Sequence, residues 1–246
     1  MKNFVMICIF AGLVVLLSGC MMVTFETSGA NAVQGTGERV SRDFPVANFT
    51  GINITGAYVV VYRQSNTNAV TIDMQENLFG YLNVYVDNGV LRINSDRPFR
   101  TNRNNTPRIY IDAPYLETVT LTAAINTEDW DMITTQQLLV SISGAANATI
   151  PMNVSELNVI ISGAANFELS GTATHANISV SGASDIDALN LQTQHTILTV
   201  AGASNADIAV SDSLDVTIAG TGRVRYVGNP QVTQSIAGVG SVRRIE

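Results

Sequence analysis

Cysteine is scarce in this chain of 246 residues, and its two copies, Cys8 and Cys20, both stand near the N-terminus. The sequence after Cys20 therefore offers no thiol for a disulfide, a thiolate nucleophile or cysteine-ligated zinc. Charge is scarce as well, because Asp, Glu, Lys and Arg make up 13% of the residues and the formal net charge is −7. Nucleic-acid phosphates attract basic surfaces, so this acidic balance argues against a nucleic-acid partner.

The sequence after the N-terminal region has no apolar pattern with helical periodicity. A short segment of alternating apolar residues, typical of a β-strand, repeats instead. Six alternating apolar segments each end at a glycine, and these glycines are Gly144, Gly163, Gly182, Gly202, Gly220 and Gly238. The steps between them are 19, 19, 20, 18 and 18 residues, a period that indicates stacked coils. We expect an all-β fold, a parallel β-helix or solenoid with coils of 18 to 20 residues. A right-handed winding is favoured over a left-handed hexapeptide type, which the 19- and 20-residue steps fit poorly.

Aligning the copies on their glycines separates inward from outward positions. Apolar residues stand two, four and six positions before the glycine, as Ile142, Val140 and Leu138 do, and we expect these rows to face the interior. Three positions after the glycines stand Asn147, Asn166, Asp185, Asn205, Arg223 and Ser241. Asn and Asp tolerate the left-handed backbone region and bond their own turn, so this row is predicted to be structural.

Carboxylates gather five positions after the glycines, at Glu168, Asp187 and Asp207. Stacked in adjacent coils they would repel one another unless a Ca²⁺ ion bridged them. Arg225 and Arg243 continue the same row and offer the alternative, which is to neutralise its end.

The N-terminus predicts export and a lipid anchor. Lys2 precedes an apolar run over residues 4–17, which is too short to span a membrane comfortably and suits a signal peptide. Cys20 directly follows Leu17-Ser18-Gly19, which has the form of a bacterial lipobox. We therefore predict a lipoprotein signal peptide over residues 1–19, lipidation of Cys20, and a flexible tether over residues 20–42. A plain secretory signal and an N-terminal core strand are the alternatives.

A single domain is predicted over residues 43–246. Residues 122–246 hold the regular repeats, whereas residues 43–121 have less regular strands and form the half that we expect to cap the coils. Asp87-Asn88-Gly89 lies between two alternating segments, which predicts an antiparallel hairpin in this half.

Several phrases of this domain resemble the family named "Putative auto-transporter adhesin, head GIN domain". They are the Gly51-Ile52-Asn53 segment, the turn that begins at Asp87, the serial Ser-Gly-Ala turns, and a tail with Gly222-Arg223-Val224 and Gly238-Val239-Gly240. The resemblance covers the sequence from about Asp43 to Glu246. It implies an exported bacterial β-solenoid with an adhesin-like role, and it brings no catalytic residues.

Two places could hold a site. Glu156, His175 and His195 stand seven positions before successive glycines, so they would stack and could ligate zinc or another divalent metal. The alternative is a solvated polar ladder. Trp130, the only tryptophan, lies among acidic residues and is the best candidate for stacking on a sugar. Its alternative role is an aromatic that caps the end of the coils.

Three functions are consistent with these features. The first is a membrane-anchored, non-enzymatic β-solenoid of the cell envelope, in the outer membrane of a Gram-negative cell and periplasmic or surface-exposed, that acts in adhesion or as a scaffold. The second is a carbohydrate-binding or polysaccharide-processing β-helix centred near Trp130, and the third is an oligomeric envelope component that stacks through its coil ends. The expected partners are the membrane and a surface glycan or envelope protein, with no cofactor. Enzymatic turnover is not expected, since the even steps leave no room for loop insertions that build a groove.

Overall fold

The structure, a computed structural model, describes residues 31–245, so the predicted signal peptide and Cys20 lie outside the described residues. Residues 32–245 form one compact unit. The described chain is built almost wholly of β-strands, with two short 3₁₀ helices, η1 (Glu76–Tyr81) and η2 (Arg103–Asn105). The predicted all-β class with little helix is confirmed. None of the helices in this part of the chain has the length and hydrophobicity that crossing a bilayer requires.

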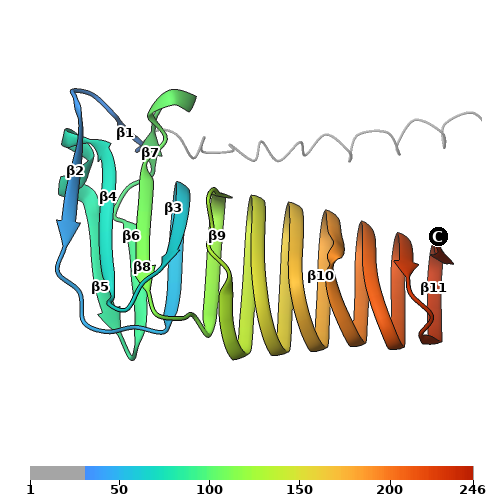
Figure 1. Ribbon diagram of the computed structural model, residues 1–246. Helices are drawn as coiled ribbons and strands as arrows, with labels where there is room; N and C mark the ends of the chain where they lie inside the picture. Colours follow the sequence, from blue (N-terminus) through green and yellow to red (C-terminus); the bar gives the residue numbers. More distant parts are fainter. Residues whose placement is uncertain (1–30, 246) are drawn as a thin grey trace, which may run out of the picture. The chain divides into compact units, whose positions relative to one another are not determined.

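Three elements form the regular half: β9 (Thr118–Thr127), β10 (Ile133–Val227) and β11 (Gln231–Arg244). Figure 1 shows the β10 ribbon winding in successive turns beside β9, and we call each turn a coil. β9 pairs in parallel with the first part of β10, and the last part of β10 pairs in parallel with β11. The register joins equivalent positions of neighbouring repeats, as in Gly144↔Ala123 and Gly220↔Gly238.

Alternating apolar residues hold the coils together. The predicted inward rows are buried through five repeats, with Ile142, Ile161, Val180, Val200 and Ile218 each at most 2% exposed. These rows join the side chains of the N-terminal half in one hydrophobic core. Because each buried aliphatic side chain contributes about 1.5–3 kcal/mol, the period-two pattern supplies most of the stabilisation of every coil.

The last coil departs from this pattern. In β11 the equivalent residue Ile236 is 39% exposed, and Val232 and Val242 of the inward rows are only partly buried. Within the described residues, β11 pairs with a neighbouring strand, β10, along only one of its two edges. Residues in the inward rows therefore become exposed where the stack stops.

The glycines form a row of backbones in close contact. Gly163 has φ +133°, and a Cβ built on it would lie 2.3 Å from the carbonyl oxygen of Gly144 in the preceding coil. The same holds along the row as far as Gly238, whose Cβ would lie 2.2 Å from the oxygen of Gly220. Two requirements thus fix glycine here: a positive φ and a coil-to-coil approach that leaves no room for a side chain.

Two more members extend the row toward the N-terminus. Ala123 in β9 pairs with Gly144 and takes φ 83°, which makes it one of three non-glycine residues with positive φ in the described chain. Gly56 in β3 (Gly51–Gln64) pairs with Ala123 and has φ 144°. The repeat therefore begins at β3, earlier than the boundary predicted from the regular glycine phrases.

The irregular half combines parallel and antiparallel pairs. β3 pairs in parallel with β9, with β6 (Val90–Ser95) and with β8 (Arg108–Ala113). The antiparallel pairs are β8 with β4 (Ala69–Gln75), β4 with β2 (Arg39–Phe44), and β5 (Leu82–Asp87) with β6. The β5–β6 pair is the predicted hairpin, and Asn88 and Gly89 have φ 50° and 74°, as a two-residue turn between twisted strands requires.

Strand structure also reaches into the sequence assigned to the tether. β1 (Val33–Gln34) pairs in parallel with β7 (Phe99–Arg100), and β2 begins at Arg39. Arg39 donates to both a side-chain and a backbone oxygen of Asp73, with Nε–Oδ1 at 3.1 Å. The sequence did not predict β2 as a strand, because an edge strand that contains Ser, Arg and Asp has the composition of a linker.

The glycine row yields a stability prediction. We expect Gly163→Ala to lower the free energy of unfolding by about 2–4 kcal/mol, because alanine adds both backbone strain and a clash with Gly144. Gly80→Ala is the matched control, since nothing lies within 4 Å of its Cβ position and its φ is not positive. Urea unfolding of the two variants measures the difference, and equal midpoints would contradict the role assigned to the row.

Candidate functional site

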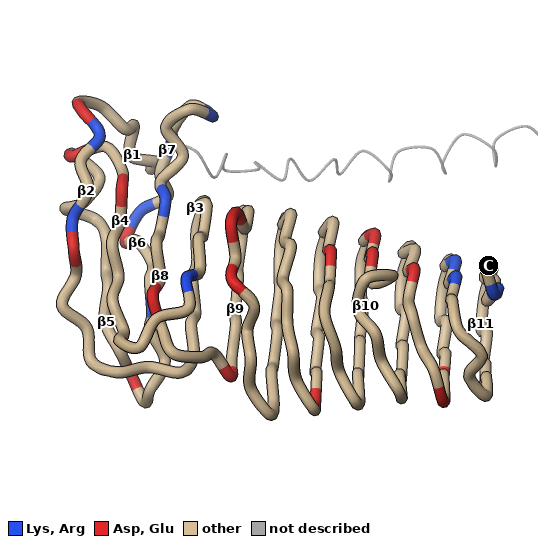
Figure 2. Tube along the Cα trace, in the orientation of Figure 1, with Lys and Arg blue, Asp and Glu red and all other residues tan. Residues whose placement is uncertain are grey.

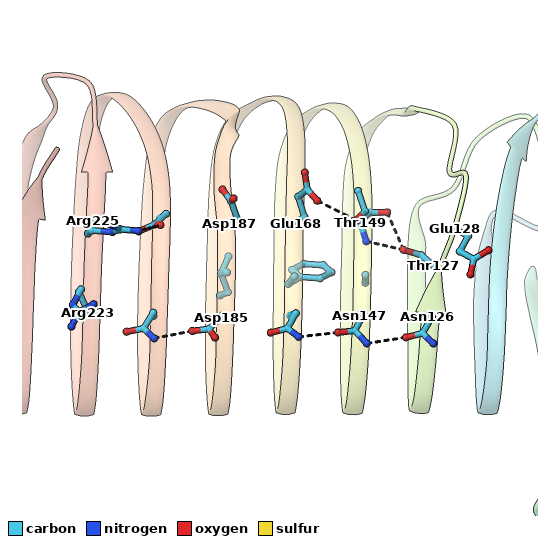
Figure 3. A pocket seen from close by; sticks show the side chains of 16 residues that line it. Asn126, Thr127, Glu128, Asn147, Thr149, Glu168, Asp185, Asp187, Arg223 and Arg225 are labelled. Atoms are coloured by element: carbon cyan, nitrogen blue, oxygen red, sulfur yellow. Dashed lines mark hydrogen bonds and ion pairs between the residues drawn. The ribbon is translucent and has the colours of Figure 1, made fainter. Parts of the chain in front are cut away.

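Two rows of polar side chains run across the coils on one side of the regular half (Figure 3). We call this surface the ladder face. Its amide row consists of Asn126, Asn147, Asn166, Asp185, Asn205 and Arg223. Its charged row consists of Glu128, Thr149, Glu168, Asp187, Asp207 and Arg225. Between the rows lies a hollow of ≈ 640 Å³.

The amide row is held by hydrogen bonds from coil to coil. The Asn147 Nδ2 donates to the Asn126 Oδ1 at 3.0 Å, and the Asn166 Nδ2 donates to the Asn147 Oδ1 at 2.9 Å. Asn205 donates to the Asp185 carboxylate at 2.8 Å. The row is structural, as predicted, but none of these residues has the expected left-handed backbone. Extended strands continue through these positions, so each side chain meets its copy in the next coil rather than its own turn.

The charged row has arginines near both ends. Arg108 in β8 donates to the Glu128 Oε2 at 2.8 Å. Arg225 donates to both carboxylate oxygens of Asp207, with Nε–Oδ1 at 2.7 Å. The hydrogen bond and the negative charge of Asp207 raise the pKa of Arg225. The alternative in which arginine neutralises the end of the row is thus the arrangement present.

The middle of the row has no such cation. Between Arg108 and Arg223 the sequence contains no Lys or Arg and twelve Asp or Glu residues. Figure 2 shows the result, with arginines confined to the irregular half and to the last coils. Glu168 accepts a 3.4 Å bond from Thr149, and Asp187 accepts one from the backbone N–H of Leu189. These neutral donors orient the carboxylates without cancelling their charge.

The predicted metal residues do stack in neighbouring coils. His175 Nδ1 lies 3.0 Å from Glu156 Oε1, and the rings of His175 and His195 stack with centroids 4.9 Å apart. His195 Nδ1 lies 2.9 Å from the Ser213 Oγ. Parallel rings direct their nitrogens side by side rather than toward one point. Consistent with this, the described residues contain no group of three His, Cys, Asp or Glu side chains that could hold a metal ion. The geometry favours the polar-ladder alternative.

Trp130 lies in the core. It is 9% exposed, and its indole N–H donates to the carbonyl of Val60 at 2.8 Å. Its ring packs on Tyr62, with centroids 5.8 Å apart, and burial raises the pKa of Tyr62 to about 12. The indole thus joins the segment before β10 to β3, and its side chain is largely buried.

A second hollow, of ≈ 520 Å³, lies on another side of the coils. Its lining is uncharged and includes Asn153, Thr172, Gln192 and Ser211. Thr172 donates to Asn153 at 2.6 Å. The sequence carries no signal for this hollow, because scattered Thr, Asn and Gln are typical of any solvated strand.

Comparison with known proteins defines the class. The family model "Putative auto-transporter adhesin, head GIN domain" matches residues 48–230, and the chain belongs to this family. The predicted resemblance is thereby confirmed. The family's name indicates a role in adhesion or binding at the cell envelope. No curated protein matches the chain.

Solved structures share the fold. A putative adhesin from Bacteroides fragilis is 23% identical with a TM-score of 0.78, over 87% of this chain and 100% of the other. A putative adhesin from Parabacteroides distasonis is 24% identical with a TM-score of 0.65, over 87% and 100%. A putative lipid binding protein from Parabacteroides distasonis is 18% identical with a TM-score of 0.66, over 88% and 100%. At these identities the likeness shows the fold alone.

The position of Trp130 can be tested in solution. Because it is the only tryptophan, emission excited at the indole band reports this side chain alone. We expect blue-shifted emission, weak quenching by iodide, and no change when glycans are added. Unfolding in urea should restore full quenching. Strong quenching of the folded protein would contradict the buried position.

Proposed function

We propose that this protein is a lipid-anchored β-solenoid of the bacterial cell envelope that acts by non-enzymatic binding, as an adhesin or scaffold. The observation that carries the proposal is the ladder face, an exposed polar surface that repeats from coil to coil on a rigid stack. Membership of an adhesin-like family supports the same role.

The solenoid assignment rests on how neighbouring repeats meet. Parallel pairs in register join β3, β9, β10 and β11, and the glycine contacts and Asn ladder continue this register inside β10. A right-handed winding is the sense that parallel β crossovers favour. The strands β2, β4, β5, β6 and β8 then cap the coils beyond β3.

Binding, rather than catalysis, suits the chemistry of the ladder face. Sugar hydrolysis by two carboxylates needs them on opposite sides of the scissile bond, one kept protonated by its environment. Here Glu168 and Asp187 are exposed and project side by side from one surface. A stack of evenly spaced amides and carboxylates is instead suited to contact with an extended partner.

Anchoring through Cys20 is the second part of the proposal. The lipobox-like Leu17-Ser18-Gly19-Cys20 follows an apolar run, so cleavage before Cys20 would leave an acylated N-terminus. Each buried methylene of the acyl chains contributes about 0.8 kcal/mol to membrane binding. An anchor of this kind places the β-domain at a membrane surface, in the outer membrane of a Gram-negative cell.

A carbohydrate ligand is the second candidate. One observation favours it: amide and carboxylate oxygens and amide N–H groups line the hollow of the ladder face, and sugar hydroxyls both donate and accept hydrogen bonds. Asn147 and Asn166 at its centre would be the contacts, in place of the buried Trp130.

We expect Cys20→Ser to release the protein from the membrane. Without the thiol no acyl chain can be attached, so fractionation of expressing cells should move the full chain from the detergent-extracted to the soluble envelope fraction, and metabolic labelling with a fatty acid should disappear. Cys8→Ser is the matched control and should keep both. Unchanged membrane association of the Cys20 variant would contradict the anchor.

A glycan array separates the two kinds of partner. If the ladder face binds sugar, Asn147→Ala with Asn166→Ala should weaken the signal at least tenfold, while Asn177→Ala, which removes an exposed Asn outside the face, should not. Absence of any glycan signal favours a protein partner. Release of products from a polysaccharide by the wild-type chain would overturn the non-enzymatic assignment.

A further inference from the structure

We propose that the ladder face binds the ladder face of a second copy of this chain, with the two stacks antiparallel, so that arginines of the last coils meet carboxylates of the middle coils. This inference rests on the proposed function, in which the ladder face is the binding surface, and it names the partner. The protein would then adhere by recognising itself.

The first support is that two opposite charges lie on one face. Arg223 and Arg225 stand on the two rows of the last β10 coil, and the register pairs Arg225 with Arg243 in β11. Arg223 and Arg243 are exposed, and their side chains make no hydrogen bond or ion pair within residues 31–245. Two coils before Arg223 lie Asp185 and Asp187, and one coil further lies Glu168. Asp185 and Glu168 have no ion pair within the described residues, and Asp187 has only a longer-range electrostatic interaction with Arg225.

The second support is that the pattern is self-complementary. A twofold axis through the coil of Asn205 and Asp207 sets each coil after it against the coil equally far before it in the partner. Arg223 and Arg225 then oppose Asp185 and Asp187 of the second copy, and Arg243 opposes its Glu168. Twofold symmetry repeats every one of these contacts, which is the usual form of a homodimer interface.

Other arrangements of two copies lack this match. Parallel stacks in register would set carboxylate against carboxylate and arginine against arginine, which is repulsive. Stacking through the exposed β11 edge would bring the arginines of both copies together. Only the antiparallel arrangement brings the uncompensated charges of both signs into contact.

Side-chain length supports the same pairing. The hollow extends along the face from Asn126 to Arg225, and in its middle the amide row consists of the short side chains Asn147, Asn166 and Asp185. Arginine side chains are long, and a guanidinium can bind a carboxylate through two parallel N–H donors. Arg223 and Arg243 of one copy therefore have the length to enter the hollow of the other.

We expect each contact between two copies to be weak, and adhesion to depend on many such contacts forming together. Five coils at about 4.8 Å spacing give a surface only about 20 Å long, below the size of a stable permanent interface. We expect dissociation constants in the micromolar range or above. On two membrane surfaces that each hold many anchored copies, such contacts add up by multivalency.

Sedimentation equilibrium of the purified full chain in detergent tests the proposal. The wild type should form dimers reversibly as its concentration rises, and about 1 M salt should shift it to monomers because the charges are then screened. Arg223→Glu with Arg243→Glu should weaken self-association at least tenfold, and this variant leaves the Arg225–Asp207 pair intact. Glu168→Arg with Asp185→Arg should weaken it similarly.

The decisive sample is the mixture of these two variants. Each repels itself, but the acidic face of one matches the basic face of the other, so the mixture should dimerise at least as tightly as the wild type. Arg103→Glu and Asp212→Arg each reverse one charge of the matching sign on an exposed residue outside the ladder face, half the change of each double variant, and should leave dimerisation unchanged. Circular dichroism and thermal melting verify that every variant folds.

Three results would overturn the proposal: a wild type that stays monomeric, dimers that persist in both double variants, or folded variants whose mixture does not associate. These results would not by themselves contradict the proposed binding function of the ladder face. If the wild type is monomeric but its glycan binding is lost in Asn147→Ala with Asn166→Ala, the ladder face is a binding surface for sugar and not for a second copy.

Discussion

The close approach of one coil's backbone to the next at the glycine row is the constraint on which the rest of the structure depends. Gly163, Gly182 and Gly202 each have a positive φ and lie against the carbonyl oxygen of the glycine before them. This contact holds neighbouring coils in register. Register in turn aligns the inward aliphatic rows, the Asn ladder and the charged row. A one-residue slip would exchange core and solvent positions in every strand that follows.

Much of the regular half could be predicted because one signal repeats in it. The period-two apolar rows and the glycine steps predicted the buried positions through Ile218, the parallel stacking and the outward rows. The hairpin at Asn88-Gly89 was predictable because the turn needs residues that accept positive φ. The predictions were wrong where this repeated signal is weak. Ala123 and Gly56 belong to the glycine row but stand outside the regular phrases. The strands β1 and β2 have the composition of a linker.

The candidate site was predictable only in its components. The repeat spacing places the carboxylates in one row with Arg225 and Arg243, but the ion pair with Asp207 and the hollow between the rows depend on side-chain geometry. Rare residue types were weak indicators of the site. Trp130 and the two histidines drew attention because they are few, and the structure uses them for packing and stacking. Ser184 and Ser204 drew none, although both are buried and Ser184 accepts from the backbone N–H of Ala165 in the preceding coil.

The long stretch without Lys or Arg has a practical consequence for detecting the protein. Trypsin cleaves after these two residues, so even the fully unfolded chain keeps residues 109–223 as a single peptide. Peptides of that size are poorly sampled in standard proteomic experiments. The coils of this protein would thus be missed in an envelope proteome prepared with trypsin, whereas a protease that cuts at Asp or Glu would divide them into short fragments.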